Sequence, residues 1–303
     1  MLKYAIKRVL LAVLTVFIIA AITFFAMNAI PGGPFASEKA IDEATMAALQ
    51  KRYGLDKPLV EQFFNYLGNL LHGDFGVSLK TGREIRAVID ESFGISLKIG
   101  LWAVVIAVAT GLVLGSVAAL CRGKWPDRVI IFLTTLFVSV PSFILATILL
   151  LVFCLLLKWV GVWSVNNQNY ILPIISLAMS PMAYITRLTK SSMLDVLGQD
   201  YIRTARAKGV RQSLVIFKHA LRNALIPVIT YVGPMTAGIV TGSMVIETVF
   251  TIGGLGTQFV KSINNQDYPM IMATTIFLAV LMVIATLLSD LIYKLVDPRI
   301  KLD

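Results

Sequence analysis

Charged residues are scarce in this chain: Asp, Glu, Lys and Arg make up 15% of its 303 residues, against 57% hydrophobic residues. A soluble domain has about 25% charged residues, so this chain has too little polar surface to face water on all sides. Its mean hydropathy of +0.81 indicates that lipid surrounds much of it. This composition excludes soluble globular, disordered and collagen-like proteins.

Cysteine and histidine are also rare, which limits the chemistry that the chain can perform. Two cysteines, Cys121 and Cys154, cannot build a disulfide framework or a zinc site by themselves. The two histidines, His72 and His219, fall on opposite sides of the membrane in the topology given below, so they cannot act together. Neither a phosphate-binding loop nor an H-E-x-x-H motif occurs. We therefore predict a non-enzymatic chain with no catalytic residues and no metal site.

Long uncharged apolar segments dominate the sequence instead. A membrane-spanning helix needs about 20 such residues, and five segments meet this length. They are Val9–Ile30, Ile99–Leu120, Val129–Leu157, Ala224–Ile246 and Met270–Ser289. The first is too long for the apolar core of a signal peptide, so we predict an uncleaved helix. A sixth segment, Tyr170–Thr186, is shorter and contains two prolines. Six spans predict an all-α polytopic membrane protein.

The basic residues predict which way the chain crosses the membrane. With six spans both termini lie on one side, where 17 of the 27 Lys and Arg fall: three near each terminus, three at 122–128 and eight at 187–222. The short connections of the other side hold only Lys158 and Lys261, and its remaining eight lie in the long segment after the first span. Basic residues accumulate in cytoplasmic loops. We therefore expect both termini in the cytoplasm, and the net charge of +10 to reflect topology and not nucleic-acid binding.

The polar segments suggest three parts. Residues 1–95 form the first span and an external helical loop, residues 96–296 form a five-helix core, and residues 297–303 form a cytoplasmic tail. Helical periodicity over Ile41–Tyr53 and Leu59–Leu71, with a helix stop at Pro31–Pro34 and a turn at His72–Gly76, predicts a small helical cap within Pro31–Lys98. Such a cap either only covers the outer face or docks an external partner.

The cytoplasmic segment Arg187–Arg222 is longer than an ordinary connection, which indicates a function. A short helix is predicted over Tyr201–Lys208, ended by Gly209. Ala205 and Ala207 are small enough for close approach to another surface. The basic side chains there suit either acidic groups of a partner or lipid phosphates, and composition alone favours lipid.

Two further features bear on transport. The predicted spans contain no charged residue, whereas an ion-coupled transporter usually has ionisable groups inside its helices. Prolines and small residues, which allow bends and close helix packing, are present instead. Gly253–Gly256 indicates a tight turn, a re-entrant loop or a flexible connection near Glu247. These features allow a moving pore lining, but tight bundle packing would explain them as well.

Several motifs resemble one family, the permeases of ABC importers in the peptide and nickel branch. Tyr201–Gly209 followed by His219–Pro227 is similar to the loop that docks on the ATPase. Thr241–Thr248 with Gly253–Gly256 is similar to the same branch, and Arg52–Pro58 with His72–Gly76 resembles its B-type subunit, in particular that of oligopeptide importers. Arg203-Thr204-Ala205 replaces the Glu-Ala-Ala that opens the general family pattern, as is common in this branch.

The resemblance implies a type I ABC importer permease fold in a bacterial cytoplasmic (inner) membrane. It also implies half of a translocation pathway, completed by a C-type permease and driven by two cytoplasmic ATPase subunits, which bind ATP and magnesium. An external peptide-binding protein would deliver the peptide, and this chain would bind no cofactor. The ATPase-docking residues implied are Tyr201, Arg203, Thr204, Ala205, Arg206, Lys208 and Gly209. The residues implied for the pathway or outer gate are Pro141, Pro234, Gly238, Gly242, Glu247, Gly253, Gly254 and Gly256.

Three alternatives remain at this point. A related importer would carry dipeptides, glutathione, nickel or antimicrobial peptides, and nothing in the predicted pore separates these substrates from oligopeptides. An ion-coupled secondary transporter would lose uptake when the ion gradient collapses, even in the presence of ATP. A scaffold without transport would have no ATPase partner.

Overall fold

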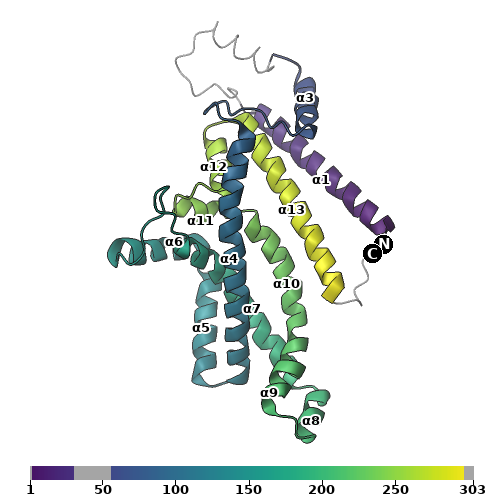
Figure 1. Cartoon of the computed structure of the whole chain (residues 1–303), viewed down its shortest axis with the longest axis vertical. Helices are drawn as coiled ribbons and strands as arrows, with labels where there is room; N and C mark the ends of the chain where they lie inside the picture. Colours follow the sequence, from purple (N-terminus) through teal and green to yellow (C-terminus); the bar gives the residue numbers. More distant parts are fainter. Residues whose placement is uncertain (1, 31–55, 297–303) are drawn as a thin grey trace. The chain divides into compact units, whose positions relative to one another are not determined.

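A computed structural model describes residues 2–30 and 56–296, and within these ranges the chain is helical with no β-strand (Figure 1). The predicted helix Ile41–Tyr53, the stop at Pro31–Pro34 and the tail at 297–303 lie outside the described residues. The chain divides into two compact units, one of Met1–Gly94 with Gln258–Leu281 and one of Ile95–Thr257 with Met282–Asp303. The predicted division at residues 95 and 297 stays a prediction.

The first unit is built around α1 (Leu2–Asn28), α3 (Leu59–Leu71) and the beginning of α13 (Tyr268–Val296). Its buried apolar cluster includes Phe24, Phe63 and Met272. Helix α3 has the predicted bounds, because Pro58 precedes its first turn and its apolar residues recur at helical spacing. The predicted turn after it is also confirmed, with Gly73 and Gly76 at positive φ.

The second unit is arranged around α7 (Ile171–Leu197), on which α5 (Trp125–Ser139) and α10 (Arg222–Val240) pack. Helix α4 (Ile85–Leu120) approaches α7 through two glycines four residues apart. A Cβ atom at Gly115 would lie 2.6 Å from the carbonyl oxygen of Thr186. Small residues are therefore required at this helix crossing, as is common between helices in lipid.

A buried ion pair joins α5 to α7. Lys190 Nζ lies 2.5 Å from Asp127 Oδ1, and the backbone N–H of Gly123 donates to Asp127 Oδ2 at 2.9 Å. The Asp127 side chain is 9% exposed. Removing Lys190 would leave the shielded Asp127 carboxylate without its cation and would weaken the contact between α5 and α7.

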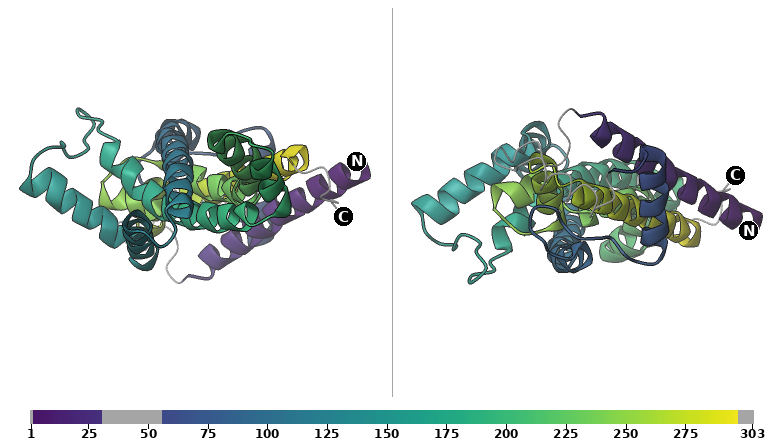
Figure 2. Two further views of the ribbon diagram at one scale, coloured as in Figure 1. Left: turned by 90° about the horizontal axis from the view of Figure 1, so that it is seen from below. Right: turned by 90° about the horizontal axis from the view of Figure 1, so that it is seen from above.

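Five helices are long and apolar enough to span a membrane, and a sixth span exists if one bent pair is counted. The pair is α5 with α6 (Ser142–Leu149) and the π-helical segment η1 (Leu150–Leu156), which meet at an angle of 107°. The predicted span Val129–Leu157 is therefore broken in the structure, at the proline where a bend was expected. Pro141 lacks an N–H group and holds Val140 in an extended conformation. Both views in Figure 2 show α6 and η1 leading away from α5.

The predicted ends of three other spans need correction. Helix α4 begins at Ile85 and not at Ile99, because the polar residues before Ile99 continue the helix. Helix α7 runs on to Leu197 with Pro181 inside it, so the start of the predicted loop Arg187–Arg222 is helical. Helix α10 ends at Val240 and not at Ile246, because Gly242 takes a φ of +95° that ends helical geometry.

Candidate functional site

The predicted docking segment forms the short helix α8 (Asp200–Ala207), close to the predicted bounds Tyr201–Lys208. Its outer surface is accessible: Tyr201 is 44% exposed, and Arg203, Thr204, Arg206, Lys208 and Gly209 are exposed as well. Ala205 differs, since it is half-buried and packs against the buried cluster beneath the helix. The exposed surface of α8 and of its C-terminal cap therefore presents an aromatic ring, a hydroxyl group, three cations and the Asp200 carboxylate.

One apolar side chain holds α8 onto the unit. Ile202 is fully buried and packs with Met193 and Val215 in a cluster contributed by α7 and η2 (Val215–Leu221). On the rim of this contact, Asn223 Nδ2 donates a hydrogen bond of 3.0 Å to the Tyr201 hydroxyl oxygen. Helix α8 is thus fixed to the start of α10 by packing and by a polar contact.

The end of α8 is closed by a Schellman motif. Gly209 has a φ of +72°, its N–H donates to the Arg206 carbonyl at 3.0 Å, and the Val210 N–H donates to the Ala205 carbonyl at 3.2 Å. Gly209 was predicted to end the helix, and this is confirmed. A Cβ atom at this position would meet no other atom within 4 Å, so a side chain here would project outward.

Charge on α8 follows the helix dipole, with Asp200 in the first turn and Arg206 in the last. The ion pair between Arg203 and Asp200, at 3.5 Å, involves two strongly exposed side chains. Such a pair contributes little to stability because water screens it. The cations of α8 are therefore available to a surface that docks on it.

The predicted gate segment contains a second site, built around the buried carboxylate of Glu247. Glu247 lies on α11 (Met244–Val249) and is 2% exposed. Its Oε1 accepts a hydrogen bond of 2.7 Å from Ser96 Oγ, and its Oε2 accepts one of 3.0 Å from the Thr257 N–H. Ser96 Oγ also accepts from the Leu255 N–H at 2.8 Å. One carboxylate thus joins α4, α11 and the start of α12 (Leu255–Asn264).

Three of the predicted gate glycines surround this carboxylate. A Cβ atom would lie 2.5 Å from Glu247 Oε2 at Gly254, 3.0 Å from Oε2 at Gly256, and 3.0 Å from Oε1 at Gly242. Gly253 differs, because a Cβ atom there would meet nothing within 4 Å. The glycines therefore permit the loop backbone to close around the carboxylate, and the segment is a packed turn.

The other predicted gate residues are placed elsewhere in their helices. Pro141 lies at the break between α5 and α6, and Pro234 lies inside α10. A Cβ atom at Gly238 would be in open space. Ser96 was missed from the sequence, because a single serine in an apolar helix gives no signal of a partner 151 residues away.

Burial raises the pKa of Glu247, and the hydrogen bonds from Ser96 and from the backbone of Thr257, Gly256 and Ser243 oppose this rise. A carboxyl group with a raised pKa in the folded state contributes stability below its ordinary pKa and loses it as the pH rises through the folded value. We expect wild-type protein to gain thermal stability relative to Glu247→Gln as the pH falls from neutral toward about 4. Unfolding midpoints in detergent at several pH values would measure this, and a constant difference would contradict it.

Comparison with known proteins extends over the whole chain. Residues 111–302 match the family described as "Binding-protein-dependent transport system inner membrane component", and residues 1–98 match its N-terminal family. The dipeptide transport system permease protein DppB of Bacillus subtilis is 47% identical over 100% of this chain and 99% of its own length. The oligopeptide transport system permease protein OppB of Haemophilus influenzae is 42% identical over 99% of this chain and 100% of its own length.

Solved structures show the same fold at low sequence identity. The MetNI methionine ABC transporter matches with a TM-score of 0.54 and 17% identity, over 69% of this chain and 96% of that chain. A second match, an amino acid ABC transporter, has a TM-score of 0.54 and 15% identity, over 69% of this chain and 94% of that chain. This is the type I fold of ABC importer permeases. The chain therefore belongs to the inner membrane components of binding-protein-dependent transport systems, as a multi-pass permease subunit of an ABC importer.

Proposed function

We propose that this chain is a B-type permease that forms half of a pathway for short peptides, completed by a homologous C-type permease. The observation that carries the proposal is the identity of 39–47% to peptide permeases over the whole chain. Two ATPase subunits bind ATP and magnesium and supply the energy, and an external binding protein delivers the peptide. This chain itself is non-catalytic and holds no cofactor.

We further propose that α8 is the docking element for one ATPase subunit. The support is its geometry: an exposed polar face on a helix that is fixed from below by Ile202 and closed by Gly209. Movement of an ATPase that holds α8 passes into α10, because η2 connects the two and Asn223 bonds to Tyr201. Because α8 is held rigidly by these contacts, a displacement of α8 by the ATPase would move α10 as well.

The orientation follows from the positive-inside rule. Both termini and α8 face the cytoplasm, where the short basic segments gather. The loop after α3 and the turn around Glu247 then face outward, toward the binding protein. The hydrogen bonds and close-packed glycines around Glu247 fix the backbone of that outer turn. A fixed backbone suits a gate that must return to one closed geometry.

Oligopeptides are the substrate class that we propose first, on the resemblance of the sequence motifs. Dipeptides are the second candidate, favoured by the 47% identity to a dipeptide permease. Both classes share free termini and variable side chains, so a pathway for either must avoid tight recognition of side chains.

Reconstitution tests this function. The chain, its C-type partner, the two ATPases and the binding protein recovered with them would be placed in liposomes, with labelled di-, tri- and pentapeptides outside. We expect uptake only with internal ATP and binding protein present. Preference for pentapeptides supports oligopeptide import, and preference for dipeptides supports the second candidate. Uptake that needs an ion gradient and not ATP would contradict the proposal.

A further inference from the structure

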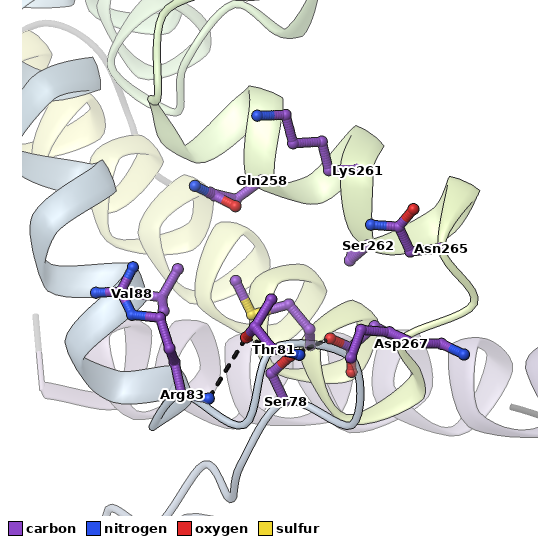
Figure 3. A pocket seen from close by; sticks show the side chains of 11 residues that line it. Ser78, Thr81, Arg83, Val88, Gln258, Lys261, Ser262, Asn265 and Asp267 are labelled. Carbon is purple, nitrogen blue, oxygen red and sulfur yellow. Dashed lines mark hydrogen bonds between the residues drawn. The ribbon is translucent and has the colours of Figure 1, made fainter. Parts of the chain in front are cut away.

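A polar cavity of about 270 Å³ lies in the first unit. Figure 3 shows α12 and Asn265 along one side, and the loop of Ser78 and Thr81 with Asp267 along the other. Its lining residues are Ser78, Lys80, Thr81, Arg83, Val88, Gln258, Lys261, Ser262, Asn265, Asp267 and Met270. Nine of these eleven are polar or charged, so the cavity is suited to a hydrophilic ligand.

Hydrogen bonds hold one wall of this cavity rigid. Asp267 is 4% exposed; its Oδ2 accepts a hydrogen bond of 2.5 Å from Ser78 Oγ, and its Oδ1 accepts one of 3.1 Å from the Leu79 N–H. Ser78 Oγ in turn accepts from the N–H and the hydroxyl group of Thr81, at 3.0 and 2.8 Å. The loop from Ser78 to Arg83 is thereby fixed onto the start of α13 before any ligand arrives.

The opposite wall presents polar groups that have no partner. Gln258 and Lys261 lie on one face of α12, and Asn265 follows it. For these three side chains, no hydrogen bond or ion pair is formed with any residue that the structure describes. Together they offer an ammonium group and two carboxamides, which supply seven N–H donors.

The charge of the lining is strongly unequal. Lys80, Arg83 and Lys261 are cationic, while Asp267 is the one carboxylate among the lining residues, and each of its oxygens already accepts a hydrogen bond. Arg83 also pairs with Glu91 outside the cavity at 2.9 Å. The Lys261 ammonium group and the two carboxamides beside it therefore fit a ligand that is anionic and rich in acceptors.

We propose that this cavity receives an acidic side chain of the external binding protein, an inference that rests on the proposed function. In the proposed orientation the cavity opens on the outer side, where that protein docks. Its volume suits one side chain entering from water. Only Val88 and Met270 are apolar, which disfavours a lipid headgroup, since a lipid brings acyl chains that need an apolar flank. The carboxylate would contact Lys261, with Gln258 and Asn265 as neutral donors beside it.

The test compares two charge reversals in the reconstituted complex. Lys261→Glu places a carboxylate in the cavity, and Arg86→Glu makes the same change on an exposed residue of the same unit that does not line it. The readout is the binding-protein concentration that half-maximally stimulates ATP hydrolysis. Like charges at an interface cost several kcal/mol, so we expect Lys261→Glu to raise this concentration roughly tenfold or more, less so at high salt. Arg86→Glu and the wild type should agree within about twofold.

The partner carboxylate can then be identified by charge exchange. Single lysine substitutions of acidic residues on the binding protein should include one that restores stimulation of Lys261→Glu. Equal responses of Lys261→Glu and Arg86→Glu would overturn the cavity proposal and leave the proposed function standing. An effect of Lys261→Glu that disappears in nanodiscs without anionic lipid would assign the cavity to a lipid phosphate instead. A wild-type complex that no binding protein stimulates would overturn the proposed function itself.

Discussion

Gly209→Asp should abolish ATP-dependent peptide uptake while the chain remains folded and inserted. Gly209 has a φ of +72°, which aspartate adopts more readily than most residues. No atom lies within 4 Å of a Cβ there, so nothing inside this chain is displaced. The new carboxylate projects at the end of α8, into the proposed contact with the ATPase. A buried unpaired charge costs several kcal/mol, enough to lower the affinity by about 100-fold or more.

A matched variant separates charge from backbone strain. Gly209→Asn introduces a side chain of the same shape, tolerates the same φ and adds no charge. We expect it to retain the ATPase in detergent pull-downs and to keep a larger share of uptake than Gly209→Asp. Membrane yield and thermal midpoint should be alike for the two variants. Normal transport by Gly209→Asp would show that the docking role given to α8 is wrong.

Gly254→Ala should destabilise the outer turn, whereas Gly253→Ala should be nearly neutral. The new methyl group at position 254 would lie 2.5 Å from Glu247 Oε2 and 2.6 Å from Glu247 Cδ. At position 253 it would meet nothing within 4 Å. Overpacking a filled site costs about 1–3 kcal/mol, and here the displaced group is a buried carboxylate with two hydrogen bonds. We expect Gly254→Ala to lower Tm by roughly 2–10 °C and to reduce uptake severely.

Two comparisons of thermal midpoints check this loss of stability. The first comparison is between the thermal midpoints of Gly253→Ala and Gly254→Ala in detergent. These variants have the same composition and carry the added methyl group at adjacent positions. Ser96→Ala removes the hydroxyl that donates to Glu247 and accepts from Leu255, so it should resemble Gly254→Ala in Tm. Equal thermal midpoints for the variants at positions 253 and 254 would show that the packing around the Glu247 carboxylate is loose enough to accept a methyl group.

Elements with local signals were predictable from the sequence. Helix α3 follows from Pro58 and an apolar face at helical spacing, and α8 follows from a polar run that Gly209 ends. Both signals act within one or two turns of helix, so no knowledge of distant partners is required. The same holds for most of the spans, because the thickness of the bilayer fixes the length of an apolar helix.

Features that depend on distant residues were not predictable. Glu247 was singled out as a gate residue, but its partner Ser96 comes from another helix. The break at Pro141 was expected only as a bend, because its size depends on what α6 packs against. The cavity beside Lys261 combines two segments about 180 residues apart in the chain, which no periodicity or motif links.

The ion pair between α5 and α7 has a consequence for biogenesis. Asp127 is synthesised 63 residues before Lys190, which at about 5–20 residues per second is a delay of roughly 3–13 s. Asp127 lies in the first turn of α5, among the basic residues at 122–128 that are expected in the cytoplasm, so its carboxylate can stay in water during that time. Helix α5 can therefore enter the bilayer before α7, and its contact with α7 is locked by the ion pair only after Lys190 has been synthesised.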